Sequence, residues 1–194
     1  MKILELKYPD SDPEQKLYLH EIEETGVTGR ETEKSKIISS IIQDFSGRSD
    51  AVLHKEASGK PFAKIGDQKI EISISHTGAL LLVACHSSKS VGVDLEKSDR
   101  KVMEALRRRM RNSEELESDI ALLTNIQIWT AKEAVLKCMG TGLRYPMRKI
   151  RLFRAESQWK AEAEGKLFKL GYMTFREFQI AVATLESESQ LSKK

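Results

Sequence analysis

Cysteine and long apolar runs are both scarce in this chain. The two cysteines, Cys85 and Cys138, lie within apolar segments, which argues against a disulfide framework and against a cysteine-based zinc site. The longest apolar run, residues 79–85, is far shorter than the ~20 residues of a membrane-spanning helix. The first ten residues lack the apolar region of a signal peptide. We therefore expect a cytoplasmic protein that contacts no membrane.

Excess charge of one sign is also missing. Lysine and arginine number 32 against 29 acids, a net charge of +3, and aromatic residues make up 6% of the chain. This composition argues against a nucleic-acid-binding protein. With 40% hydrophobic residues, the chain can fill a core, which excludes a disordered protein. The basic residues do cluster at Arg107–Arg109 and Arg111. This run is either a solvated helix face or a docking patch for phosphate, nucleic acid or an acidic protein.

Hydrophobic periodicity predicts an α+β fold in two similar halves. In each half a long helix precedes antiparallel strands, so we expect a boundary near residues 90–100. The predicted helices cover residues 13–23, 31–45, 101–110 and 120–139, with a further helix start capped by Ser113. The predicted strands cover residues 2–7, 51–55, 71–75, 79–86, 91–96, 148–154, 157–162, 166–174 and 177–184. We expect the strands at 71–75, 79–86 and 91–96 to form one antiparallel meander.

Two acids share one face of the strand predicted at residues 91–96. Side chains alternate along a strand, so Asp94 and Glu96 point one way while three apolar residues point into the core. Paired carboxylates suit a hard divalent cation that keeps water or a phosphate as its other ligands. An ordinary polar strand face is the alternative, since two acids at this spacing are common.

The helix predicted at residues 120–139 carries a third acid. Glu133 and Lys137 are four residues apart and share a face with Trp129, as an ordinary surface ion pair would. The helix is, however, apolar almost all round, so Glu133, Lys132 and Lys137 need partners there. Those partners could be one another, or a bound ion and phosphates.

Four motifs occur in a characteristic order: GKP at 59–61, ISISHTG at 72–78, VGVDLE at 91–96 and WTAKEAVLK at 129–137. The last two fit G-x-D-x-E and W-[ST]-x-K-E-x-x-x-K, with Asp94 and Glu133 separated by 39 positions. This pattern resembles the 4′-phosphopantetheinyl transferase superfamily. The upstream GKP and Ser-His elements resemble its surfactin-synthetase-activating subtype, which is a monomeric pseudo-dimer.

The resemblance implies an enzyme that moves the 4′-phosphopantetheine arm of coenzyme A to a serine of an apo carrier protein. The reaction releases adenosine 3′,5′-bisphosphate and depends on Mg²⁺. It implies two halves, residues 1–92 with the nucleotide contacts and residues 93–194 with the metal site, and an active site in the cleft between them. The implied metal ligands are Asp94, Glu96 and Glu133, and the implied catalytic residues are Glu133 and Lys137. The implied contacts to coenzyme A are Arg30, Lys60, Pro61, Ser75, His76, Lys132 and Lys137.

The sequence departs from the family pattern in places. The basic residues for the nucleotide 3′-phosphate are hard to align, with Arg30, Lys34 and Lys36 as candidates. Arg109 and Met110 stand where relatives carry paired aromatics before the helix. We expect an acidic carrier protein to dock on the Arg107–Arg111 run, with Met103, Leu106 and Met110 as an apolar strip; these three could instead pack into the core.

Two other functions remain as alternatives. A non-catalytic module could bind coenzyme A or a carrier protein on the same fold. A nucleic-acid-binding protein could use the Arg107–Arg111 run, and a steep salt dependence of DNA binding would identify it.

Overall fold

The computed structural model describes residues 3–8, 11–22 and 27–188, with the side chains of residues 27–30, 187 and 188 outside the description. In the first half the elements are β1 (Ile3–Leu6), β2 (Gln15–Glu21), α1 (Val27–Ser46), β3 (Val52–Lys55), β4 (Pro61–Ile65), β5 (Gln68–Thr77) and β6 (Leu80–His86). In the second half they are β7 (Val91–Lys97), α2 (Glu104–Met110), α3 (Glu117–Ile120), α4 (Asn125–Met139), β8 (Arg151–Ala155), β9 (Gln158–Ala163), β10 (Lys166–Phe175) and β11 (Phe178–Glu188). Short 3₁₀ turns at Gly142–Arg144 and Met147–Lys149 connect α4 to β8.

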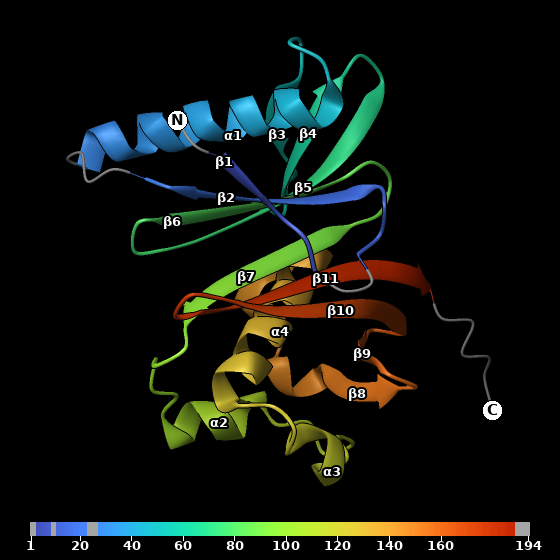
Figure 1. The fold of residues 1–194 in the computed structure, drawn as a ribbon. Coiled ribbons are helices and arrows are strands. Elements are labelled where there is room, and N and C mark those ends of the chain that lie inside the picture. The colour runs from blue at the N-terminus through green and yellow to red at the C-terminus, as the bar shows by residue number, and fades with distance from the viewer. Residues whose placement is uncertain (1–2, 9–10, 23–26, 189–194) are drawn as a thin grey trace.

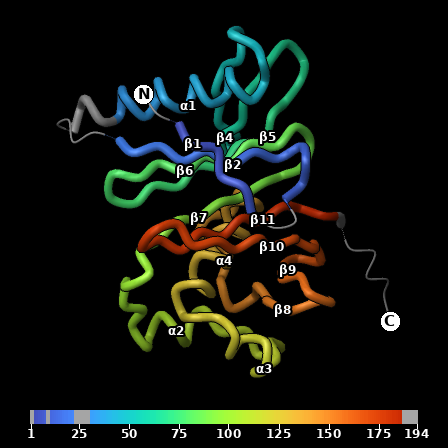
Figure 2. The backbone as a smooth tube through the Cα atoms, in the orientation of Figure 1, coloured from blue at the N-terminus to red at the C-terminus, as the bar shows by residue number. Residues whose placement is uncertain are grey.

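The described elements form two antiparallel sheets between two long helices. The first sheet has the strand order β1-β2-β6-β5-β4-β3 and the second β7-β11-β10-β9-β8. α1 covers the outer face of the first sheet and α4 the outer face of the second, so the molecule has four layers (Figure 1). The backbone trace shows the two sheets stacked, with β7 and β11 facing the first sheet (Figure 2). The predicted α+β fold in two similar halves is confirmed.

Strand β6 shows why the first sheet lies between two layers. Its sequence, LLLVACH, is buried throughout, because alternate side chains point to opposite faces. Leu81, Val83 and Cys85 pack under the isoleucines of α1. Leu80, Leu82 and Ala84 pack against β7 and β11. A strand with both faces covered has no polar alternation.

Strand β11 uses the same alternation in the second sheet. Phe178, Ile180 and Val182 face the first sheet. Ala181 and Ala183 face α4, and their small side chains let the helix pack closely on the strand. β7 lies at the edge of this sheet, paired with β11 from Val91 to Lys97.

The polar face of β5 joins the two halves. Ile72 and Ile74 point toward α1, as their spacing predicts. The alternating residues Glu71, Ser73 and Ser75 point the other way, toward the neighbourhood of β7 and α4. We call this contact of β5 with β7 and α4 the seam. It is polar where the rest of the contact between the sheets is apolar.

Several sequence-based expectations are wrong. The helix predicted at 13–23 is strand β2, because Leu17 and Leu19 face the second sheet while Tyr18 faces α1. Ser113 caps no helix; the next helix, α3, begins at Glu117. The helix predicted at 120–139 begins at Asn125, where Thr124 caps it with Gln127 in a capping box.

The predicted meander is correct for β5 and β6 but wrong for β7, which pairs with β11 in the second sheet. The change of sheet thus falls between His86 and Val91, whereas the expected division at residues 92 and 93 lies within β7. Among the described helices, none has both the length and the apolar character needed to cross a membrane.

Candidate active site at the seam

Asp94 lies at the centre of a polar cluster at the seam. The residue is 6% exposed. Oδ1 accepts hydrogen bonds from Ser75 Oγ at 3.0 Å and from Lys137 Nζ at 2.8 Å. Oδ2 is buried and has no hydrogen-bond partner among the described residues. A buried carboxylate oxygen without a hydrogen-bond donor costs free energy, so Oδ2 of Asp94 would be stabilised by a hydrogen-bond donor or a cation.

Lys137 connects the helix to both halves. From the last turn of α4 its Nζ reaches Asp94 on β7 and, at 2.9 Å, Ser75 Oγ on β5. Its side chain is 28% exposed, so Lys137 is less buried than Asp94. The structure thus brings together three residues that lie far apart in sequence.

Glu96 follows Asp94 on the same face of β7. Its Oε1 accepts a hydrogen bond from Trp129 Nε1 at 3.3 Å and forms an ion pair with Arg100. The Arg100 guanidinium also lies over the Trp129 ring, 5.0 Å from its centroid. Trp129 was expected on the face of Glu133 and Lys137, and the structure gives it this contact with the strand.

Glu133 lies on α4, one turn before Lys137, and is partly buried. Burial, and after it the negative charge of Asp94, raise the pKa of the Glu133 carboxyl. The positive charges of Lys137 and Arg100 act in the opposite direction. Glu133 therefore lies within electrostatic range of Asp94, Lys137 and Arg100.

Gly92 allows α4 to lie against β7. A β-carbon at this position would be 1.9 Å from the carbonyl oxygen of Ala134 and 2.4 Å from the amide nitrogen of Cys138. Residues 92, 94 and 96 share a face of β7, so the face that carries the two acids begins with glycine, which has no β-carbon. This close approach of the helix to the strand is the physical reason for the glycine in the G-x-D-x-E motif.

A family model for the 4′-phosphopantetheinyl transferase superfamily matches residues 90–185, about half of the chain. The matched segment starts just before β7, contains α4 and ends in β11, so it covers Asp94, Glu96, Glu133 and Lys137. The chain belongs to the 4′-phosphopantetheinyl transferase superfamily. It is an enzyme of phosphopantetheine transfer. A search of the curated proteins found no match.

In this transferase the ammonium group of Lys60 is bound by other residues of the protein. It is 7% exposed, and its Nζ donates to Ser90 Oγ at 2.7 Å and to Cys138 O at 2.9 Å and pairs with Glu71 Oε2 at 2.9 Å. These partners use the three donors of an ammonium group. The expectation that Lys60 contacts coenzyme A is therefore not supported; it fastens the end of α4 to the first half.

Lys132 is also a structural residue of the transferase. It is fully buried; Nζ lies 2.6 Å from Glu115 Oε1 and donates to Ile150 O at 2.8 Å and to Met110 O. Helical geometry turns it away from Glu133 and Lys137, and its donors are filled. The expectation that Lys132 contacts the cofactor is therefore wrong for this structure: it ties α2 and the segment before β8 to α4.

The remaining predicted contacts lie in the first half. His76 is exposed next to Ser75 at the end of β5, and Pro61 begins β4 beside Lys60. Lys34 on α1 pairs with Glu31 at 2.9 Å. The side chain of Arg30 lies outside the described residues.

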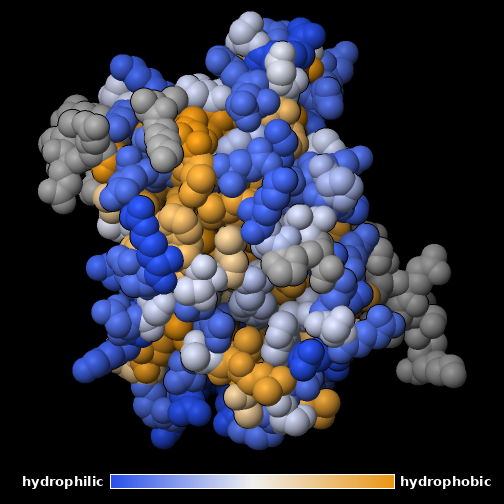
Figure 3. Space-filling view, viewed as in Figure 1, coloured by the Kyte–Doolittle hydropathy of each residue, from blue (hydrophilic) through white to orange (hydrophobic). Residues whose placement is uncertain are grey.

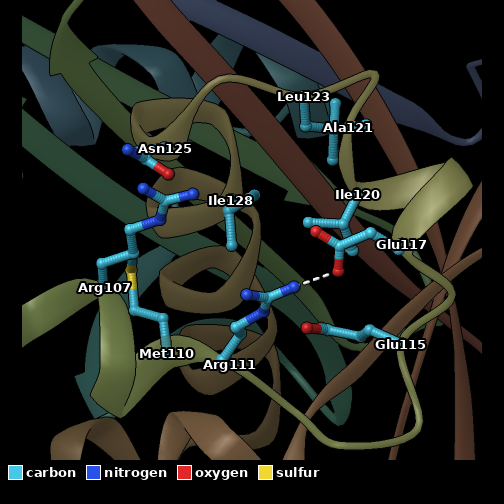
Figure 4. A pocket seen from close by; sticks show the side chains of 10 residues that line it. All are labelled: Arg107, Met110, Arg111, Glu115, Glu117, Ile120, Ala121, Leu123, Asn125 and Ile128. Carbon is cyan, nitrogen blue, oxygen red and sulfur yellow. Dashed lines mark hydrogen bonds and ion pairs between the residues drawn. The ribbon is translucent and has the colours of Figure 1, made fainter.

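The arginines of the basic run point to two sides of α2. Arg107 and Arg111 line a cavity of about 260 Å³ between α2, α3 and the start of α4, where Arg111 pairs with Glu117 (Figure 4). Arg108 and Arg109 line a larger cavity of about 580 Å³. The other lining residues of that cavity are Leu106, Trp129, Leu143, Tyr145, Pro146, Met147 and Arg148.

The predicted apolar strip beside these arginines is partly wrong. Met110 is buried in the core, whereas Leu106 lines the larger cavity and Met103 is 74% exposed. Polar and charged side chains separate the apolar patches on the face shown in Figure 3.

The acids of the seam fit a hard divalent cation in their chemistry. They are all carboxylates, which Mg²⁺ prefers, and Asp94 Oδ2 is a buried acceptor without a partner among the described residues. Within the described part of the chain, however, no three His, Cys, Asp or Glu side chains are already gathered into a metal site. Glu96 is the acid turned to other partners, Arg100 and Trp129.

Proposed function

We propose that this enzyme transfers 4′-phosphopantetheine from coenzyme A to a serine of an apo carrier protein, releasing adenosine 3′,5′-bisphosphate. The observation that carries the proposal is the cluster of Asp94, Lys137 and Ser75 at the seam, beside Glu133 with its raised pKa. The reaction needs a proton acceptor, a cation at the pyrophosphate and a means to hold the two substrates in line.

Each group of the cluster meets one of these needs. Lys137 has a partly exposed side chain, and its ammonium would bind the pyrophosphate as a compact positive charge. Glu133 would accept the proton of the attacking serine; in the metal-free protein, burial and the charge of Asp94 raise the pKa of its carboxyl. Ser75 and Asp94 hold the Lys137 ammonium in place before substrate arrives.

Asp94, Glu96 and Glu133 would hold Mg²⁺. When bound, the ion supplies neutralisation of the negative charge on the pyrophosphate. His76 is exposed at the end of β5 beside this cluster, and it would contact the nucleotide part of coenzyme A. We also propose that the enzyme belongs to the surfactin-synthetase-activating subtype and is a monomer, because each half of this chain contributes its own sheet.

The activity is tested by mixing the protein, Mg²⁺, coenzyme A and an apo carrier protein and weighing the carrier by mass spectrometry. The expected result is a gain of one phosphopantetheine arm per carrier. Asp94→Asn and Lys137→Met should remove most of the transfer while the circular dichroism spectrum stays the same. A carrier that never gains mass, tested with fatty-acid, polyketide and peptide synthetase carriers, would contradict the proposed function.

The carrier protein would be acidic and would dock on the side of α2 that carries Arg108 and Arg109. These arginines stand over an apolar cavity that Trp129 also lines, and Trp129 contacts Glu96 of the proposed site. Exposed charges mainly steer encounter and are screened by salt. Arg108→Glu with Arg109→Glu should raise the KM for the carrier and weaken its salt dependence.

The matched control is Arg107→Glu with Arg111→Glu, which reverses the same number of charges on the other side of α2. It should change the carrier KM much less. Equal effects of the two double variants would mean that the run acts through its overall charge and that the cavity beside Trp129 is not the docking site.

A further inference from the structure

Arg100 is a charged residue of the seam that no motif includes. It lies in the connection between β7 and α2, where its amide nitrogen donates to Lys97 O at 3.1 Å. Its guanidinium pairs with Glu96 and stacks on Trp129, while 40% of the side chain stays exposed. Its guanidinium is thus held by the side chains of Glu96 and Trp129.

The position of Arg100 coincides with the place where a metal's charge is needed. Its guanidinium pairs with one of the three acids and acts electrostatically on a second, Glu133. Lys137 neutralises the third, Asp94. The two cations therefore balance two of the three negative charges, and Glu96 Oε1 has its lone pairs occupied by Arg100 and Trp129.

We propose that Arg100 is a displaceable counter-ion of Glu96, which competes with the divalent cation for this carboxylate. The inference rests on the proposed function, since it requires that the three acids bind a metal. A carboxylate oxygen cannot accept a guanidinium hydrogen and coordinate a metal with the same lone pairs. A metal that binds Glu96 through Oε1 therefore requires Arg100 to leave, and the positive charge over Trp129 leaves with it.

The direct test is Mn²⁺ binding, measured from the electron paramagnetic resonance signal of the free ion, without coenzyme A and without turnover. A partly exposed ion pair contributes up to ~1 kcal/mol, which is about a fivefold change in Kd. Arg100→Ala should therefore bind Mn²⁺ about fivefold more tightly than the wild type. Arg100→Lys, which keeps the charge but loses the planar fork, should lie between them.

Lys101→Ala is the matched control, because it removes one positive charge from the next residue of the same exposed segment. It should leave the Kd for Mn²⁺ nearly unchanged. A second measurement uses fluorescence in a Trp159→Phe background, where Trp129 remains as the sole tryptophan of the chain's two. Titration with Mg²⁺ should change its emission in the protein with Arg100 and much less in Arg100→Ala.

The outcomes separate the inference from the proposed metal site. Tight Mn²⁺ binding with equal Kd values in wild type and Arg100→Ala would overturn the competition and leave the metal site standing. An equal gain in Lys101→Ala would also overturn it, because general electrostatics would then suffice. No Mn²⁺ binding to either protein would overturn both.

Discussion

Replacing Gly92 by alanine should damage catalysis more than stability. The added β-carbon would lie 1.9 Å from Ala134 O, and ordinary contact begins near 3.4 Å. Both clashing groups are backbone atoms of α4, so no side chain can turn away. The helix must retreat from β7 by about 1.5 Å at this point, the difference between these two distances.

That retreat separates Glu133 and Lys137 from Asp94. Overpacking a core costs about 1–3 kcal/mol, which a chain of this size can survive. A misplacement of about 1 Å in a catalytic constellation costs about a hundredfold in rate. We therefore expect Gly92→Ala to fold, to unfold at a lower urea concentration, and to transfer phosphopantetheine about a hundredfold more slowly.

Gly171→Ala is the matched control for this experiment. Its β-carbon would meet the ring of Tyr8 at 2.4 Å, on β10 in the same sheet but away from α4. It should lower the urea midpoint while the rate per folded molecule stays near that of the wild type. If Gly92→Ala keeps full activity, or if both variants lose activity in proportion to stability, then the close approach of α4 to β7 does not set the geometry of the site.

The remaining predictions concern charges within the second half. Lys137→Met should raise the pKa of Glu133 further in the metal-free protein, because Lys137 lowers it; carbon NMR of the Glu133 carboxyl measures this, and a fall would contradict the assigned contact. Because the pKa of the Glu133 carboxyl is higher in the folded than in the unfolded protein, this group stabilises the fold at pH values below its ordinary pKa of 4.5. That stabilisation is lost as the pH rises through the folded-state pKa. Wild type should therefore lose stability relative to Glu133→Gln over that interval, as urea midpoints at several pH values would show. Lys132→Met should cost about 3–5 kcal/mol, because it leaves Glu115 buried without its cation; adding Glu115→Gln should recover part of the loss, and a single variant as stable as wild type would refute the role given to Lys132.

The sequence predicts strands and helices well where one face is buried. The isoleucines of α1 recur at helical spacing, and Ile72 and Ile74 alternate, because each element there has a polar side. Strand β2 was mistaken for a helix because both of its faces are covered, which removes the polar alternation. Burial by a second sheet is a tertiary fact that no local pattern contains.

The pairing of β7 with β11 also could not be predicted from the sequence. Consecutive strands often pair, which favoured a meander with β6. The chain instead changes sheet at the short connection after His86, and β7 pairs with β11, some ninety residues later. Nothing in residues 87–90 distinguishes such a crossing from an ordinary hairpin turn.

Strand alternation and helical spacing place the three acids and Lys137 on the faces that they occupy in the structure; their roles stay predictions. The same spacing did not show which lysine faces inward to the seam and which to the far side of α4. Lys132 and Lys60 satisfy their donors with backbone carbonyls and with Glu115 and Glu71, which are contacts between distant segments. Arg100 carried no signal in sequence, because it lies outside the four motifs and outside the Arg107–Arg111 run.

The edge of β7 that faces β5 has a bearing on aggregation. An unpaired strand edge offers its amides and carbonyls to any other chain. Here Ser73 Oγ accepts the amide hydrogen of Val93 at 3.0 Å, so a side chain takes the place of a neighbouring strand. Ser73→Ala would leave that buried amide without its acceptor, which costs about 1–3 kcal/mol. The packing of β5 on this edge closes the strand that bears Asp94 to intermolecular pairing while the two halves stay together. Aggregation through this edge would require the halves to separate.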